Sequence, residues 1–172
     1  MAKLRKMLGS VEDPAVTGLM ALIETQSKAT LARWAAEYAG GRYLPLLECR
    51  EAEPPSVAVE AVRACLEGRM PLKEVKPVLA AARKSAQEEK DPVRQAATRA
   101  VATACGVLTT PTNALGFAFY GAAAIAYHEA GTEADRAVHD RLAQEELERI
   151  LSSLQAAAVP DEPEPVKVNW NC

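Results

Sequence analysis

The sequence predicts an all-α protein: a single-domain helical bundle or a stack of helical hairpins with about six to seven helices. The chain has 34 alanines and only two phenylalanines among its 172 residues, and this composition favours close helix packing over a sheet of β-branched residues. The stretch from Ala100 to Tyr127 carries no charged side chain, although a quarter of the chain is charged. We therefore expect that stretch to be buried. Pro111 interrupts it, which predicts two core helices rather than one membrane span.

The first quarter of the chain predicts two helices. Asp13-Pro14 has the form of an N-cap followed by proline at the first helical position, and it predicts a helix over about 14–25. Apolar residues at helical spacing then run from Leu31 to Leu47. Because Gly40-Gly41 interrupts this second pattern, we expect one helix with a break at the glycines.

The next two predicted helices form a hairpin. Apolar residues at helical spacing over 58–66 are followed by Gly68, a residue typical of the position just after a helix. Met70-Pro71 then opens a helix that extends to Ala86. Pro77 lies about one turn inside this helix, so we expect a kink near its start unless the helix begins later.

The second half of the chain predicts three further helices and a tail. Asp91-Pro92 repeats the cap-and-proline pattern before a regular apolar stripe that reaches Leu108. The central apolar helix is expected over 114–129, and a last helix with one charged face over 133–155. We assign residues 1–155 to the helical domain. The rest, 156–172, is rich in proline and acid and is predicted to be poorly ordered, with Trp170 the one residue that could dock on the core.

Charge and cysteine content exclude several classes of function. The net charge of −3 arises from mixed acids and bases, which disfavours nucleic-acid binding because phosphate recognition requires a concentrated basic face. The four cysteines, Cys49, Cys65, Cys105 and Cys172, are too widely spaced for a metal or redox motif. The N-terminal residues do not form a secretory signal. We therefore expect reduced thiols in a cytoplasmic protein with no cofactor, no metal and no membrane partner.

The two histidines are the candidates for acid–base chemistry. A pocket near Asn113, His128 and His139 would make the protein a small-molecule binder or an enzyme, since histidine titrates near neutrality. The plainer interpretation places each histidine at a helix end or on an exposed face. We favour it because the spacing of metal-ligand motifs is missing. Cys105 likewise reads as a buried structural thiol. We therefore expect no enzymatic activity.

An aromatic and basic cluster is the candidate for partner binding. It consists of Arg33, Trp34, Tyr38 and Arg42, with Tyr43 nearby. We favour the plainer interpretation, in which the cluster packs against the core with its arginines reaching solvent. On the last helix, Glu145, Glu146 and Glu148 could meet a basic partner, although a solvated face explains them as well.

Five segments in order carry a resemblance to a known family. They are Leu31–Tyr38 with Trp34, Leu44-Pro-Leu-Leu47-Glu48, Ala58–Gly68, Ala80–Ala86 and Ala96–Cys105. Together these segments resemble a bacterial putative immunity protein family of polymorphic-toxin systems, over roughly residues 30–130. Family members commonly carry histidines in the two alanine-rich helices. Here the matching places hold residues such as Arg83 and Cys105, so any site that used those histidines is lost.

The resemblance implies a non-enzymatic protein that neutralises a cognate toxin by stoichiometric binding. An acidic chain would suit a basic toxin surface and would give fast, salt-sensitive association. Two alternatives remain open at this point: the small-molecule pocket described above, and a homo-oligomeric structural scaffold.

Overall fold

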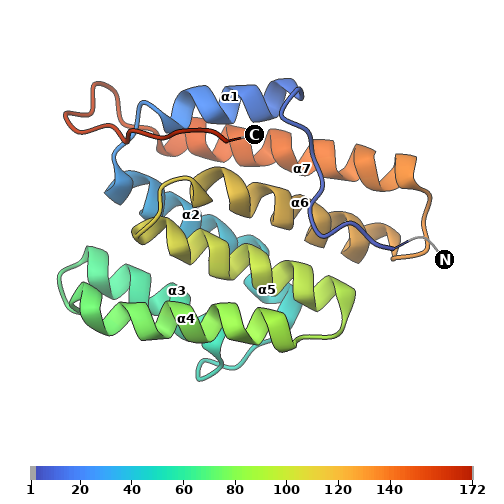
Figure 1. Ribbon diagram of the computed structural model, residues 1–172, viewed down its shortest axis with the longest axis horizontal. Coiled ribbons are helices and arrows are strands. Elements are labelled where there is room, and N and C mark those ends of the chain that lie inside the picture. The colour runs from blue at the N-terminus through green and yellow to red at the C-terminus, as the bar shows by residue number, and fades with distance from the viewer. Residues whose placement is uncertain (1–2, 172) are drawn as a thin grey trace.

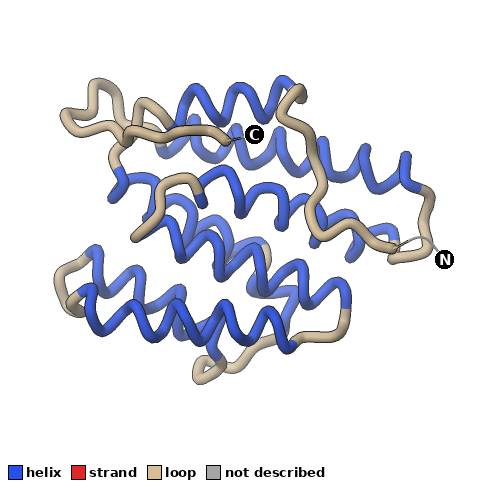
Figure 2. The backbone as a smooth tube through the Cα atoms, viewed as in Figure 1, coloured by secondary structure: helices blue, strands red, loops and turns tan. Residues whose placement is uncertain are grey.

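The helices pack side by side, most of them against a neighbour in the chain (Figures 1 and 2). In the computed structural model, which describes residues 3–171, α1 packs against α7, α7 against α6, α6 against α5, α5 against α4, and α4 against α3, while α2 packs against α3 and α5. The elements are α1 (Pro14–Ile23), α2 (Lys28–Arg42), η1 (Leu44–Leu47), α3 (Pro54–Leu66), α4 (Leu72–Glu88), α5 (Pro92–Cys105), η2 (Gly106–Leu108), α6 (Asn113–Ala130) and α7 (Arg136–Ala157), where η marks a 3-10 helix. The predicted single all-α domain is confirmed.

Two helices begin where their capping residues predict. The Asp13 carboxylate accepts a hydrogen bond from the backbone N–H of Ala15 at 2.8 Å, and the Asp91 carboxylate accepts one from that of Arg94 at 2.9 Å. Each cap satisfies a backbone N–H that has no partner within its helix. A proline follows each cap at the first helical position, where its missing N–H has no cost.

The predicted break at the glycine pair is wrong. Gly40 and Gly41 both lie inside α2, which ends at Arg42, and the chain changes to a 3-10 helix only after Tyr43. A Cβ on Gly40 would lie 3.1 Å from Cγ1 of Val59. This glycine therefore serves the close approach of α2 to α3 rather than a turn.

Other boundaries differ by a few residues. α3 begins at Pro54, earlier than its apolar stripe, because two prolines are tolerated at its first positions. α7 begins at Arg136 and ends at Ala157. Pro77 lies inside α4 on an exposed position, and the kink there stays a prediction. No helix in residues 3–171 combines the length and the apolar composition that crossing a bilayer requires.

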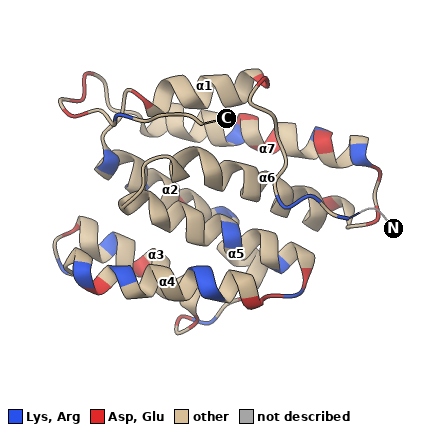
Figure 3. Ribbon diagram, viewed as in Figure 1, with Lys and Arg blue, Asp and Glu red and all other residues tan. Residues whose placement is uncertain are grey.

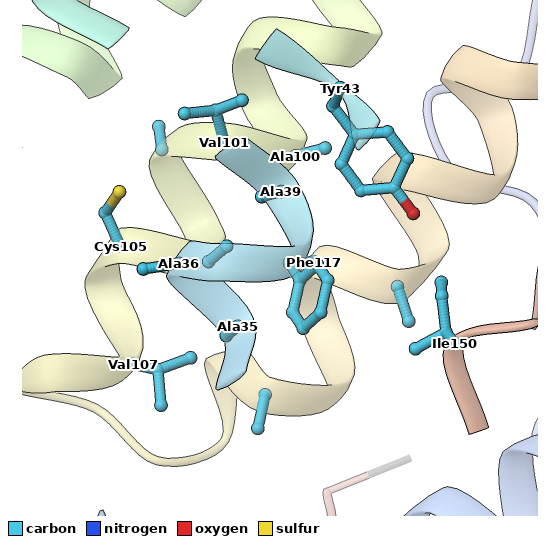
Figure 4. Close-up of a cluster of buried hydrophobic side chains, with 14 of the residues drawn as sticks. Ala35, Ala36, Ala39, Tyr43, Ala100, Val101, Cys105, Val107, Phe117 and Ile150 are labelled. Carbon is cyan, nitrogen blue, oxygen red and sulfur yellow. The ribbon is translucent and has the colours of Figure 1, made fainter. Parts of the chain in front are cut away.

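Small side chains fill the core between α2, α5 and α6. Figure 4 shows Ala35, Ala36 and Ala39 of α2 beside residues of α5 and beside Phe117 of α6. The charge-free stretch forms the second half of α5, η2 and most of α6, and the majority of its residues are buried. Alanine lets helix axes approach closely and loses no side-chain entropy on burial.

The C-terminal segment after α7 runs back beside α1 (Figure 1). The buried Gln26 holds this segment at two points. Its side-chain amide exchanges two hydrogen bonds with the backbone of Val159. Its backbone carbonyl oxygen accepts a hydrogen bond from the N–H of Val166 at 2.8 Å. The indole of Trp170 packs against the core and donates to Glu24 at 3.0 Å. The low order expected for residues 156–172 stays a prediction, and Cys172 lies outside the described residues.

Candidate functional site

The four candidate residues on α2 point to different sides of the helix. Arg33 is exposed to solvent. Trp34 is buried, donates from its indole N–H to Ser153 Oγ at 2.8 Å and stacks edge-on with Phe117 at a centroid distance of 5.2 Å. Tyr38 and Arg42 face α7. The aromatic members of the cluster therefore pack inside the protein.

A buried carboxylate joins Tyr38, Arg42 and Tyr43 to α7. The Glu146 side chain has no exposed surface. Its Oε2 accepts hydrogen bonds from the hydroxyls of Tyr38 at 2.8 Å and Tyr43 at 2.6 Å. Its Oε1 accepts from Nε and Nη2 of Arg42 at 3.0 and 2.9 Å. We call these four residues the Glu146 cluster.

The cluster compensates the cost of burying a charge. A buried carboxylate is stable only when a cation pairs with it and donors fill its lone pairs, and both conditions are met here. Burial and the adjacent Glu146 charge hold the pKa of the Tyr38 and Tyr43 hydroxyls well above its usual range. Both tyrosines therefore remain protonated donors at neutral pH. With its acceptor positions filled, Glu146 fixes α2 against α7 and is not free to act as a general base.

Gly121 of α6 makes room for the cluster. A Cβ at this position would lie 2.1 Å from the Tyr43 hydroxyl oxygen and 2.2 Å from its Cζ. Any side chain here would therefore displace the tyrosine ring and its hydrogen bond to Glu146. The absence of a side chain at Gly121 of α6 therefore allows Tyr43, just after α2, to pass α6 and reach Glu146 of α7.

Sequence reasoning placed Glu146 wrongly. The residue was grouped with Glu145 and Glu148 on a surface that could be solvated or meet a basic partner, but only those two neighbours are exposed. Helical spacing distinguishes Glu146 from its two neighbours. Positions 139, 143, 146 and 150 share one side of α7, and all four are buried. An acid on the apolar side of a helix predicts a buried, paired carboxylate.

The predicted pocket residues lie at separate ends of α6. Asn113 is the first residue of the helix and His128 lies near its end, about 22 Å apart along the axis at 1.5 Å per residue. His139 is close to the second end, where its ring meets Tyr127 edge-on at 4.8 Å and Nε2 contacts the carbonyl oxygen of Gly131 at 2.8 Å. A single small-molecule pocket does not span Asn113 and His128.

The two histidines differ in exposure. His128 is exposed, as expected for a helix end. His139 lies in the first turn of α7, at a helix end as expected, but it is only 4% exposed and shares the buried side of the helix with Glu146. Within residues 3–171, no group of three or more His, Cys, Asp or Glu side chains is placed to hold a metal ion.

Cys49 and Cys105 are held as thiols. Burial raises the pKa of Cys105, which has no exposed surface, to about 12. Burial and the neighbouring Glu53 raise that of Cys49 to about 11. A nucleophilic cysteine needs a lowered pKa, so these shifts favour the structural interpretation of Cys105.

Arg33 lines a small groove between α2 and α3. Its other lining residues include Glu37 of α2, Val59 and Arg63 of α3, and Glu67 just after α3. The groove has a volume of about 110 Å³, below the 300–1,000 Å³ or so that small-molecule sites usually have. It can take one side chain of a partner more readily than a metabolite.

The comparison with family models decides the family. Residues 21–154 match the model of the Imm-5 like putative immunity protein. The chain belongs to this family. For the Imm-5 like chain, no curated protein and no solved structure gave a match.

The Imm-5 like region coincides with the body of the fold. It begins near the end of α1 and stops three residues before α7 ends. It therefore contains the whole Glu146 cluster, whereas most of α1 and the C-terminal segment lie outside it. The suspected resemblance over about 30–130 is confirmed and extends further in both directions.

Proposed function

We propose that this protein is an immunity protein that binds a cognate bacterial toxin in a stoichiometric complex and catalyses no reaction. The observation that carries the proposal is the family match over residues 21–154. The packing supports it. The Glu146 carboxylate is hydrogen-bonded within the core, and burial keeps the Cys105 thiol protonated, so neither group is free to act as a base or a nucleophile.

Under this proposal the toxin meets the outer surface of the bundle in the cytoplasm. The closely packed small side chains of α2, α5 and α6 hold the helices, and so the backbone that carries the exposed side chains, in one arrangement. A preformed surface loses little conformational entropy when it binds and so supports tight association.

The test is co-expression with the toxin domain encoded by an adjacent gene. We expect growth of a toxin-expressing strain to be restored, and the two purified chains to elute from size exclusion as one complex with a 1:1 mass. Toxin expressed with an unrelated helical protein is the control. No retained toxin at low salt, together with no rescue of growth, would refute the proposal.

The same measurement addresses self-association. The mass of the protein alone distinguishes a monomer from the homo-oligomeric scaffold considered above. A scaffold role predicts a stable oligomer that neither dissociates nor changes mass when the toxin domain is added.

A further inference from the structure

One side of α4 presents cations without acids. Seven residues at helical spacing form this side, which we call the basic flank of α4: Leu72, Lys73, Lys76, Ala80, Arg83, Lys84 and Gln87. All seven are exposed. The two acids of the helix, Glu74 and Glu88, are also exposed. Glu88 lies one turn after Lys84 and borders the flank, whereas Glu74 lies outside it. Figure 3 shows the blue segments along α4, on the part of the bundle most distant from α1.

Three of the four cations on this flank have no ion-pair partner within residues 3–171, in contrast to several arginines on neighbouring helices. On α3, Arg63 pairs with Glu60 at 2.6 Å, and on α7, Arg141 pairs with Glu145 at 3.0 Å. Among the ion pairs within residues 3–171, the basic flank contributes only Lys84 with Glu88, at 3.9 Å. Lys73, Lys76 and Arg83 are therefore available to a partner without first breaking an internal pair.

The stability of the helix does not explain this arrangement. Lys73 lies in the first turn of α4, where the helix dipole disfavours a positive charge. Lys73 and Lys76 are three residues apart on the same side, so they repel each other. These charges cost folding free energy, and a binding partner of opposite charge would offset that cost.

We propose that the basic flank of α4 is the surface that binds the toxin, and that it meets an acidic patch on the toxin. This inference rests on the proposed immunity function. Lys73 and Lys84 are eleven residues apart, so the flank extends about 16 Å along the helix, enough to contact several carboxylates. Leu72, which is 39% exposed, adds apolar area at one end of the row of cations.

The local charge and the net charge of the chain predict opposite partners. A net charge of −3 favours a basic toxin, whereas this flank favours an acidic one. We choose the local charge because contact energies and steering depend on the groups nearest the partner, and distant charges are screened beyond about 8 Å in physiological salt. A nucleic-acid duplex is a poorer occupant, since four cations on one helix of an acidic chain do not form the extended basic face that phosphate binding requires.

The experiment uses two variants with the same change in net charge. K76E/R83E reverses the basic flank, and K28E/K167E reverses two exposed lysines that line another groove beside the C-terminal segment. Binding to the toxin domain of the adjacent gene is measured at low and physiological salt, with circular dichroism as the check of folding. We expect K76E/R83E to weaken binding about tenfold or more, mainly through the association rate, and to reduce its salt dependence. K28E/K167E should bind within about twofold of the wild type.

The outcomes separate this inference from the proposed function. Wild-type protein that neither binds nor neutralises the toxin would refute the function itself. Wild-type binding that K76E/R83E retains in full, or that both variants weaken equally, would overturn the role of the flank and leave the function intact. Binding of a 20-base-pair DNA duplex or of anionic phosphatidylserine vesicles that is lost in K76E/R83E, with toxin binding unchanged, would also overturn it.

Discussion

Charged side chains are fully paired in the Glu146 cluster and largely unpaired on the basic flank of α4. In the cluster, a carboxylate without exposed surface accepts hydrogen bonds from Arg42 and two tyrosines, and Arg149 lies 3.8 Å from it. On α4, three of four cations have no ion-pair partner among residues 3–171. The difference follows from solvent: water stabilises an exposed charge, while a buried one must find its partner within the chain. Charges inside therefore hold the fold, and unpaired charges outside are free to bind.

Removing the buried carboxylate gives the largest expected effect. Glu146→Ala leaves Arg42 and two tyrosine hydroxyls without their acceptor, so we expect the free energy of unfolding to fall by about 3 kcal/mol or more. Urea denaturation measures this loss. Glu145→Ala, which changes the exposed neighbour, is the control and should stay within about 0.5 kcal/mol. If the two variants were equally stable, Glu146 would not hold α2 to α7.

Alanine at Gly121, beside the Glu146 cluster, and at the exposed Gly41 should change the free energy of unfolding in opposite directions. Gly121→Ala places a Cβ where the Tyr43 ring lies, so we expect a loss of about 2 kcal/mol in the free energy of unfolding. Gly41→Ala adds a Cβ with no atom within 4 Å and should gain several tenths of a kcal/mol through helix propensity. Thermal and urea unfolding of both variants give the sign. A neutral Gly121→Ala would show that α6 does not need this close approach.

High pH should lower the free energy of unfolding through the buried thiol of Cys105. The pKa of Cys105 is raised to about 12 by burial, from an ordinary value of 9.0, so above pH 9 the unfolded chain binds fewer protons than the folded one. The free energy of unfolding then falls as pH rises from about 9 to about 12, with this thiol contributing about 1 kcal/mol per pH unit. Urea unfolding at pH 8, 9 and 10 should show a smaller slope for Cys105→Ala than for the wild type. Equal slopes would contradict the buried-thiol assignment.

Charge reversal on α4 should have the smallest effect on stability. K76E/R83E removes repulsion between cations and breaks no ion pair recorded within residues 3–171, so its free energy of unfolding should lie within about 0.5 kcal/mol of the wild type. Urea denaturation checks this. A loss above about 1 kcal/mol would mean that these side chains support the fold, and the contrast between α4 and the cluster would not hold.

The helices could be predicted because their signals are local. Asp13 and Asp91 act within three residues of their helix starts, and apolar spacing identifies the buried side of each helix. The glycines of α2 show the limit of local signals. Gly40 faces Val59 of another helix, and only the packed structure distinguishes this close approach from a break in the helix.

The site was harder to predict because its partners are distant in the chain. Tyr38 and Arg42 were recognised as a cluster, but their shared acceptor lies more than a hundred residues away. The residue types of α4 do not distinguish a solvated helix face from a binding surface. Only the coordinates show that Lys73, Lys76 and Arg83 have no ion-pair partner within residues 3–171.

The place of the termini has a practical consequence for reporter fusions. The C-terminal end of the described chain lies beside α1, on the part of the molecule away from α4 in the view of Figure 1. A fluorescent protein or an affinity tag attached at this end would leave α4 uncovered. Surface-immobilised protein for binding kinetics should therefore be tethered at this end, so that an arriving toxin finds α4 facing the flow.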